Sequence, residues 1–501
     1  MWRGLRPRAR FLPIRLICGR SSGVERHLAK VKVEGSNPFA RSTFPFFSKN
    51  AIDSLPFDAL RIVLPYFISL TGPPVTTLHY NSIAEITFEL NKADAAVEKR
   101  FAAMGADAPN AKASLIYVGA RDFGKTFIHP VAAEADRKKE FPEQLWPLFG
   151  EYDLNGLTVA QKYGGLDMGY LAHFAAAEAI SYYSGSVGLS YIANSNLCVN
   201  QIYLNGDEEQ KKKWLPGLLA GTIHGGLAMS DEDNGSHTSN MRLAATPSED
   251  GKGFHLNGPK YWITNGGTAD VLVVYARTKP SHEKNPNDGL TAFIVDTKTP
   301  GFQAGAKIDK DSMRASGTYP LSFDNTYVPN ECVLGQADNG NAVLMSGLNY
   351  ERLILTAGAL GLAQSSFDVV MNYAPKRMQF HKELTQHDVY RTQLTDVYGK
   401  LIGARRQCYG VAAFADEGRH LTNSKERRPF LTNADAGLLK NNVCDIAHDI
   451  TYQCIKLMGG SGLVSEYPLM RNNADVILYP IGGGTENMCN RIAANDLFKP
   501  A

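Results

Sequence analysis

The spacing of apolar residues changes twice along this 501-residue chain, and that change constrains the fold more than any other feature. Residues 113 to 225 have helical spacing, as in YLAHFAAAEAISYY. Residues 226 to 335 break into short strand-like runs bounded by Gly, Asn, Asp or Pro, and residues 336 to 501 return to long helical patterns. This order predicts an α+β protein with an N-terminal α-helical domain, a middle antiparallel β domain and a C-terminal helical bundle.

Local signals predict where several elements lie. Asp207 is typical of a helix N-cap and Gly221 of a helix end, so DEEQKKKWLPGLLAG is expected to be helical between them. A later helix is expected to end at Gly418. We expect one apolar face of that helix to contain Leu394, Val397, Tyr398 and Leu401. The expected strands are GFHLNG, YWITNG, ADVLVVYAR, LTAFIVD and YPLSF.

Composition excludes several classes of function. A net charge of +2 gives no electrostatic reason to expect nucleic acid as a partner. The most apolar early run, LRIVLPYFISLTG, is short and contains Pro65, so we expect no membrane insertion. The seven cysteines are scattered without a CxxC spacing, which favours a reducing compartment and argues against a metal site. There is no Walker loop, GxGxxG or HExxH motif.

Residues 1 to 112 are expected to be an atypical extension outside the fold. Up to Glu25 the segment is rich in arginine and lacks acids, which is typical of a mitochondrial transit peptide. The stretch SSGVERHLAKVKVEGSNPFARS can instead be back-translated into a transfer-RNA gene. Our hypothesis is therefore that residues 1 to 45 or so are a misassigned reading frame in a bacterial gene. The expected location is the bacterial cytoplasm, with the mitochondrial matrix as the alternative; N-terminal mass spectrometry of the native protein tests this.

The segment GLNYERLIL, residues 347 to 355, places an acid in an apolar helical stripe. The helical neighbours of Glu351 are Gly347, Leu348, Ile354 and Leu355. Glu351 could pair with a neighbouring arginine or lie at a subunit boundary. Alternatively it is a general base whose pKa is raised by burial. Arg352, on the more polar side of the same turn as Asn349, could hold an anionic group such as a phosphate.

The segment KYWITNGG, residues 260 to 267, alternates like a strand. Alternation sends Trp262 and Thr264 to one face and Tyr261 and Ile263 to the other. This is compatible with an ordinary half-buried strand. It is also compatible with a stacking plane and a hydroxyl for a flat heteroaromatic cofactor, such as a flavin.

Five segments, in this order, resemble the signatures of the acyl-CoA dehydrogenase family: LAMSDEDNGS, NGPKYWITNGG, FDNTYVPNECVLG, MSGLNYERLILTAGALG and YPIGGGTEN. The resemblance extends from residue 113 to residue 499. It implies a fold that ends in a C-terminal four-helix bundle, FAD as cofactor and an acyl-CoA substrate. It also implies a homotetramer that passes electrons to an electron-transferring flavoprotein.

The position of the acid resembles one branch of the family. Most members have their catalytic glutamate in a C-terminal Tyr-Glu-Gly-Thr motif, where this chain has Gly483. In the isovaleryl-specific branch the base lies in the earlier Glu-Arg pair, which Glu351 matches. The resemblance implies that Glu351 removes the α-proton of isovaleryl-CoA while hydride leaves for flavin N5, giving 3-methylcrotonyl-CoA in leucine catabolism. The alternatives are a dehydrogenase or oxidase of another short acyl-CoA, and a catalytically impaired member that serves as a binding or scaffold protein.

The resemblance also implies roles for further residues. Arg377 is expected to reach the FAD of a neighbouring subunit, and the Gly483 N–H to stabilise the thioester carbonyl together with a flavin ribityl hydroxyl. The expected cofactor-binding residues are Leu227, Met229, Ser230, Ser236, Trp262, Ile263, Thr264, Arg377, Lys456, Gly459, Gly460, Thr485, Glu486 and Asn487. The expected substrate-binding residues are Ser236, Asn349, Tyr350, Arg352, Leu355, Gly483 and Gly484.

The chain departs from the family at several of these positions. The usual Ser-Glu-Pro-x-Ala-Gly-Ser-Asp is replaced by the segment from Ser230 to His237. A tyrosine expected before the base is Ala342. Further departures from the family pattern are His381, Asp388 and Lys456. An aspartate near the FAD pyrophosphate would repel it and a lysine would attract it, so these positions bear on how well FAD is retained.

Overall fold

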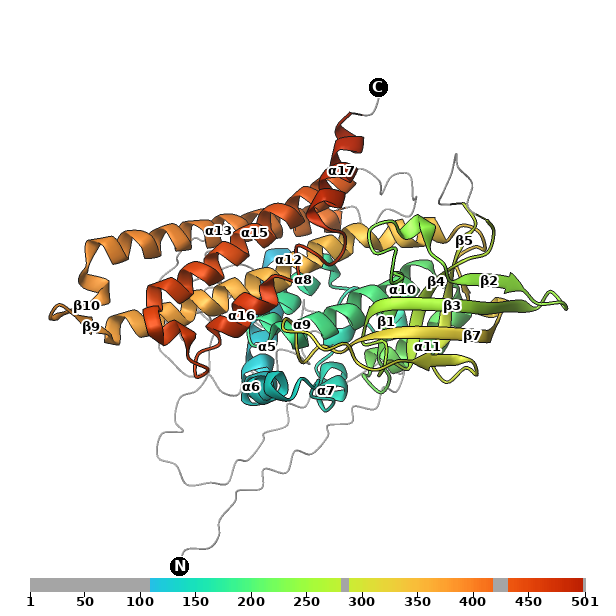
Figure 1. Cartoon of the computed structure of the whole chain (residues 1–501), viewed down its shortest axis with the longest axis horizontal. Helices are drawn as coiled ribbons and strands as arrows, with labels where there is room; N and C mark the ends of the chain where they lie inside the picture. The colour runs from blue at the N-terminus through green and yellow to red at the C-terminus, as the bar shows by residue number, and fades with distance from the viewer. Residues whose placement is uncertain (1–108, 281–287, 418–430, 499–501) are drawn as a thin grey trace, which may run out of the picture. The chain divides into compact units, whose positions relative to one another are not determined.

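The computed structural model describes residues 109–280, 288–417 and 431–498 (Figure 1). The expectations for residues 1 to 108 and for Gly418 lie outside the described residues. The first described helix, α5, begins at Pro109, just before the predicted start of the helical domain at residue 113.

The N-terminal part is helical, as predicted. Its helices are α5 (Pro109–Phe123), α6 (His129–Lys138), α7 (Leu145–Glu151), α8 (Gly169–Ser181), α9 (Gly185–Ile192), α10 (Gln201–Asn205) and α11 (Glu208–Leu219). The predicted N-cap of α11 is confirmed, because the Asp207 side chain accepts from the Gln210 N–H at 2.8 Å and the Gln210 side chain accepts from the Asp207 N–H at 3.1 Å. The chain leaves α11 at Gly221, whose φ of +67° is the left-handed conformation that glycine adopts without strain.

The middle part forms a sheet in the order β6-β7-β3-β2-β4-β5-β8, with β1 also paired to β4. The strands are β1 (Gly225–Ala228), β2 (Ala244–Pro247), β3 (Gly253–Thr264), β4 (Val271–Arg277), β5 (Leu290–Asp296), β6 (Phe302–Ala304), β7 (Thr318–Pro329) and β8 (Val333–Leu334). Most neighbours are antiparallel, as expected. However, β1 and β2 each pair with β4 in parallel, so the sheet is mixed. The reason is that the chain reaches β4 from β1 and β2 by long connections rather than by hairpin turns.

Two of the predicted strands are in fact one. GFHLNG and YWIT are the two halves of β3, which pairs along its whole length with β7. The register shifts between Leu256 and Gly258 and again between Lys260 and Ile263. The second shift is a β-bulge, in which Trp262 takes a φ of +63°. The turn-like residues at positions 257 to 259 mark an irregular point within a strand, and the sequence alone could not separate that from a turn.

The C-terminal part is dominated by three long helices that pack against one another (Figure 1). Its elements are α12 (Gly340–Tyr373), the short strands β9 (Met378–Gln379) and β10 (Lys382–Glu383), α13 (Asp388–Glu417), α15 (Asn433–Met458), α16 (Leu469–Val476) and α17 (Glu486–Leu497). The shorter helix α16 packs on both α12 and α15, which completes the predicted four-helix arrangement. In α13, Val397 and Leu401 are buried and Leu394 and Tyr398 half-buried, as their spacing predicts.

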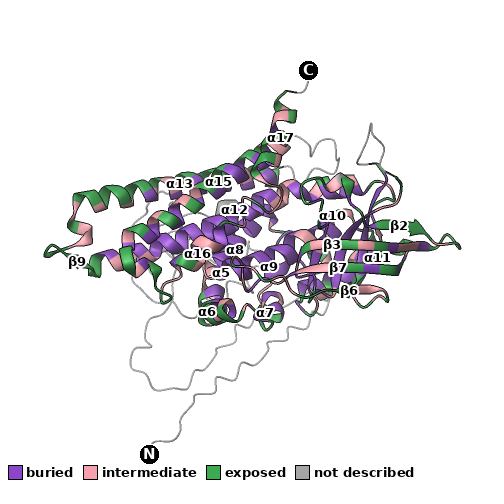
Figure 2. Cartoon of the chain, in the orientation of Figure 1, coloured by how far each residue is buried: buried purple, intermediate pink, exposed green. Residues whose placement is uncertain are grey.

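Helix α12 lies at the centre of the fold and is buried on nearly all sides (Figure 2). By length and composition the helical stretch Gly340–Lys376 could cross a membrane, but 94% of its most apolar window is buried inside the protein. Packing against α8, α13 and α15 therefore accounts for its apolar composition.

A buried polar network joins the N-terminal helices to the bundle. Glu178 on α8 accepts from Arg405 on α13 (Nε to Oε1, 3.1 Å) and from the Tyr409 hydroxyl at 2.8 Å. The Arg405 guanidinium also donates to Gln364 on α12 at 2.7 Å. Glu178 and Arg405 are at most 1% exposed, so each charge depends on the other for its compensation.

We predict that Arg405→Met destabilises the protein by about 3–5 kcal/mol, because it leaves the Glu178 carboxylate buried without its cation. Urea denaturation followed by circular dichroism measures the effect. The double variant Glu178→Leu with Arg405→Met removes both charges and should recover most of the loss. An Arg405→Met protein as stable as the wild type would show that the network does not hold the two parts together.

Candidate functional site

Glu351 lies on α12, and among the described residues it forms no ion pair. In the described ranges its carboxylate makes no hydrogen bond or salt bridge, and the adjacent Arg352 bonds elsewhere. Among the described residues Glu351 therefore forms no salt bridge with an arginine, and Arg352 bonds to other groups. The alternative of a subunit boundary at Glu351 stays a prediction.

The surroundings of Glu351 favour its neutral form. The side chain keeps a little accessible surface but is surrounded by protein atoms, and burial raises its pKa from 4.5 to about 7. The positive charges of Arg352 and Lys440 act in the opposite direction and prevent a larger rise. A carboxylate that titrates near neutrality can both accept and return a proton at physiological pH.

The loop from Pro480 to Gly484 lies directly against Glu351. Gly483 and Gly484 have φ values of +66° and +100°. A Cβ at Gly483 would lie 3.5 Å from Glu351 Oε1 and only 2.8 Å from Leu355 Cδ1, so any larger residue at this position would displace Leu355. Among the described residues the Gly483 N–H has no acceptor, whereas the Gly482 N–H bonds to Leu478 O at 2.9 Å. The loop thus presents a backbone donor beside an unpaired carboxylate.

Arg352 holds this loop. Its Nε donates to Gly483 O at 3.2 Å and its Nη1 donates to Asn349 Oδ1 at 3.0 Å. The side chain is 2% exposed, and the Asn349 amide in turn donates to Leu431 O at 3.2 Å. Arg352 and Asn349 are therefore already used within the chain, and their contact with CoA stays a prediction. Tyr350 is stacked on Tyr170 of α8, with ring centroids 3.9 Å apart.

Two further groups near Glu351 were missed by the sequence reasoning. Lys440 on α15 is fully buried and donates to Pro480 O and Gly484 O. Tyr275 on β4 is also fully buried, its hydroxyl has no partner among the described residues, and its charge would interact with that of Glu351. Each lies in an element distant in sequence from Glu351. The sequence around Lys440 mixes polar and apolar residues, so it gave no signal that this lysine would be buried.

The bulge in β3 presents Trp262 at the surface. Trp262 is 53% exposed while the next residue, Ile263, is 2% exposed, and Thr264 is half-buried. The end of β3 is held by the buried Asn265, whose amide donates to Ser190 O and Gly225 O, both at 3.1 Å. This fixes the end of the strand that carries the exposed Trp262 indole and, two residues later, the Thr264 hydroxyl, and an exposed indole suits stacking on a flat aromatic ring. Other predicted cofactor residues in this part are the half-buried Leu227, Met229 and Ser230 and the exposed Ser236.

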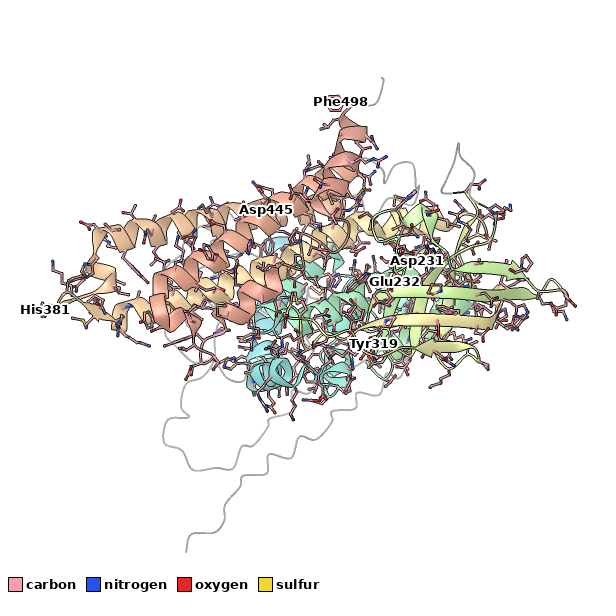
Figure 3. The ribbon with its side chains drawn as sticks, in the orientation of Figure 1. Asp231, Glu232, Tyr319, His381, Asp445 and Phe498 are labelled. Atoms are coloured by element: carbon pink, nitrogen blue, oxygen red, sulfur yellow. The ribbon has the colours of Figure 1, made fainter. Side chains whose placement is uncertain are left out.

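The predicted cofactor residues fall into two groups. Thr485 is the N-cap residue of α17, with Glu486 and Asn487 in the exposed first turn, so these three follow the loop at Glu351. The second group, Arg377, Lys456, Gly459 and Gly460, is exposed at the other end of the bundle, where the Tyr373 and Ser461 hydroxyls are 3.0 Å apart. From Glu351 to the end of α12 is about 33 Å at 1.5 Å per residue. Figure 3 places His381 at this far end and Asp231 at the sheet.

The departures from the family pattern have different environments. Asp231 forms a buried ion pair with Lys260 at 2.9 Å and accepts from the Arg242 N–H, so this acid supports the segment before Ser236. Asp388 is exposed at the start of α13 and lies 3.7 Å from Arg391. Lys456 is exposed, with its ammonium 5.5 Å from the centre of the Tyr452 ring.

Comparison with known proteins matches consecutive parts of the chain. The acyl-CoA dehydrogenase N-terminal, middle and C-terminal domains match residues 111–222, 226–326 and 338–498. Mitochondrial isovaleryl-CoA dehydrogenase of Solanum tuberosum is 41% identical over 379 residues, which is 75% of this chain and 88% of that protein. Mitochondrial 2-methylacyl-CoA dehydrogenase of the same plant is 39% identical with the same coverage. The structure of a Mycobacterium smegmatis glutaryl-CoA dehydrogenase in complex with FADH2 superposes with a TM-score of 0.69 at 29% identity, over 77% of this chain and 94% of that one.

We predict that Glu351→Gln becomes more stable than the wild type as the pH rises. The pKa of Glu351 is raised from 4.5 to about 7, so the folded wild type loses stability as the pH rises between these values. Below pH 4.5 the two proteins should differ little, and above pH 8 Glu351→Gln should be more stable by roughly 3 kcal/mol. Urea denaturation at pH 4.5, 6 and 8.5 measures the difference.

The comparison must be made between the two proteins at each pH. Asp368 and Asp475 are also buried carboxyl groups, with pKa values raised by burial to about 6 and about 7, so the wild-type curve alone does not isolate Glu351. A stability difference that is the same at all three pH values would contradict a raised pKa of Glu351.

Proposed function

Because the chain belongs to the acyl-CoA dehydrogenase family, and is therefore an oxidoreductase acting on a CH–CH group, we propose that it oxidises isovaleryl-CoA to 3-methylcrotonyl-CoA with FAD as cofactor. The observation that carries this proposal is the unpaired, half-buried Glu351 facing a glycine loop. The loop from Pro480 to Gly484 contains no carboxylate, because Gly483 stands where most members of the family have their glutamate.

The proposed base works through its environment. The α-proton of a thioester is weakly acidic, so its acceptor must be ionised yet basic near neutral pH. Glu351, with a pKa of about 7, meets both conditions. Arg352 and Lys440 supply the positive charge that keeps part of the population ionised. Since the carboxylate makes no hydrogen bond within the described residues, no internal partner has to be displaced before it can accept the proton.

The developing negative charge on the thioester oxygen needs a donor. The Gly483 N–H is such a donor, since it has no acceptor among the described residues and belongs to the loop that contacts Glu351. The Arg352 bond to Gly483 O restricts the orientation of the adjoining peptide group. A side chain at position 483 would clash with Leu355, and in this proposal the branched acyl chain lies against these two residues.

FAD fits the surface around β3. The exposed Trp262 indole and the Thr264 hydroxyl provide a stacking plane and a hydrogen bond for its ring system. When bound, FAD supplies the acceptor for the hydride that leaves the β-carbon. The chain's own residues orient the substrate between this surface and Glu351 and exclude water from the base.

The second group of predicted cofactor residues supports a shared site. Arg377, Lys456, Gly459 and Gly460 lie about 33 Å along α12 from Glu351, too far to complete the same site within one chain. We propose that they contact the FAD of a neighbouring subunit in a homotetramer. Electrons would then pass to an electron-transferring flavoprotein, in the bacterial cytoplasm or the mitochondrial matrix, as part of leucine catabolism.

A second candidate substrate is a 2-methylacyl-CoA. The relative that carries that name in Solanum tuberosum is 39% identical to this chain, only two points below the isovaleryl-CoA dehydrogenase of the same plant. Both acyl chains are short and branched and differ in the position of one methyl group. An apolar pocket separates such substrates by only about 1–3 kcal/mol, so the choice needs a direct measurement. Transfer of electrons to oxygen and a scaffold role are the remaining alternatives.

We predict that isovaleryl-CoA bleaches the flavin absorbance of the purified wild-type protein under anaerobic conditions and that Glu351→Gln shows no bleaching. Removing the base should slow reduction at least a hundredfold. Stopped-flow absorbance of the oxidised flavin measures this, with 2-methylbutyryl-CoA as the competing substrate.

Binding of flavin to Glu351→Gln controls for folding, because a yellow variant that is not reduced has lost only the chemistry. Faster bleaching by 2-methylbutyryl-CoA than by isovaleryl-CoA would overturn the substrate assignment but would still support an acyl-CoA dehydrogenase reaction. A wild-type protein that binds no flavin after reconstitution would overturn the enzymatic proposal in favour of a scaffold role.

A further inference from the structure

Lys440 is a buried lysine that has no carboxylate partner in the part of the chain that the structure describes. It lies on α15, is 0% exposed, and forms no salt bridge among the described residues. Its ammonium donates to Pro480 O at 3.0 Å and to Gly484 O at 2.8 Å. Burial lowers its pKa, with opposing contributions that include Glu351. Burying a charged ammonium group costs free energy unless hydrogen bonds or an opposite charge compensate for it.

The two acceptors are the two ends of the loop that faces Glu351. The hydrogen bonds of the Lys440 ammonium therefore connect the two ends of the loop from Pro480 to Gly484. The residue between them that contacts Glu351, Gly483, is held from the other side by Arg352 Nε at 3.2 Å. One buried cation from α15 and one from α12 thus fix a loop with two left-handed glycines, which would otherwise have many accessible conformations.

We propose that Lys440 is a positioning residue for the dehydrogenation: its ammonium group closes the 480–484 loop against Glu351 and places a positive charge near that carboxylate. This inference rests on the proposed role of Glu351 as base. In this proposal Lys440 acts through the loop and the carboxylate, and its ammonium bonds to Pro480 O and Gly484 O.

Three groups face Glu351 from the elements packed around it. Arg352 lies on the same helix, Lys440 on α15 and the Tyr275 hydroxyl on β4. Tyr275 is neutral near pH 7, because burial raises its pKa far above that value. Of the two cations that act on Glu351 among the described residues, Lys440 is the one on a separate helix, and it is therefore the one replaced in the tests.

The first test is the pH profile of flavin reduction by isovaleryl-CoA in the wild type, Lys440→Met and Lys440→Arg. Loss of the cation should move the apparent pKa of the base upward by about one unit, so that reduction at pH 7 slows several-fold more than at pH 9. Lys440→Arg keeps the charge and should keep the wild-type midpoint. The half-buried Lys400, which pairs with Asp396 and Asp449, supplies the control Lys400→Met, with the same change in net charge and an unchanged midpoint.

The second test needs no turnover and separates this inference from the proposed function. Thermal unfolding of the flavin-bound protein is compared in a double-mutant cycle of Lys440→Met and Glu351→Gln at pH 5.5 and pH 8.5. At pH 8.5 Glu351 is ionised, so Lys440→Met should lower the Tm by about 2 °C more in the wild-type background than in the Glu351→Gln background. At pH 5.5 Lys440→Met should lower the Tm by the same amount in the wild-type and Glu351→Gln backgrounds.

Coupling at pH 8.5 in a protein that does not oxidise acyl-CoA would uphold the link between Lys440 and Glu351 and overturn only the proposed function. The inference would be overturned if Lys440→Met lowered the Tm equally in both backgrounds at both pH values and left the midpoint of the pH profile of flavin reduction unchanged. If Lys440→Met does not fold, Lys440→Gln replaces it, since a glutamine amide can still donate to a loop carbonyl without a charge.

Discussion

Glu351 is a half-buried carboxylate that forms no hydrogen bond or ion pair among the described residues, and the central part of this structure is arranged around it. Glu351 lies in a helix that is packed on almost every side, between the sheet and the bundle. Its own helix supplies Arg352, α15 supplies Lys440, and both cations bond to the carbonyls of a single glycine loop rather than to the acid. The site therefore lowers the cost of the charge without forming an ion pair that would make the carboxylate a weaker base.

The rest of the fold holds this arrangement in place. The buried network of Glu178, Gln364 and Arg405 ties α8, α12 and α13 together, which fixes the helix that carries the base. On the sheet side, Asn265 ties the end of β3 to β1 and α9, which fixes the exposed Trp262 and its bulge. The two surfaces between which an acyl chain would lie thus depend on side chains that do no chemistry themselves. Strain at Trp262, with its positive φ, is tolerated because the surrounding ladder of β3 and β7 continues on both sides of the bulge.

Much of this organisation was predictable because it depends on local patterns. The order of helical and strand-like segments follows from apolar spacing, the N-cap at Asp207 from local hydrogen bonding, and Glu351 from an acid in an apolar stripe. What could not be predicted depends on contacts between distant parts of the chain. The bulge at Trp262 arises from pairing with β7, the use of Arg352 within the chain from the loop 131 residues later, and Lys440 from the packing of α15 on the same loop. The resemblance located Gly483 but gave no indication of which side chains hold its loop.

The most direct test of the central claim is exchange of the α-hydrogen of bound isovaleryl-CoA in deuterium oxide, followed by mass spectrometry of the recovered thioester, in the wild type and in Glu351→Gln. Because exchange reports removal and return of the α-proton, it isolates the base from transfer of hydride. If Glu351 is the base, the wild type should incorporate deuterium at the α-carbon and Glu351→Gln should not. Equal incorporation by the two flavin-bound proteins would show that another group removes the proton and would contradict the account.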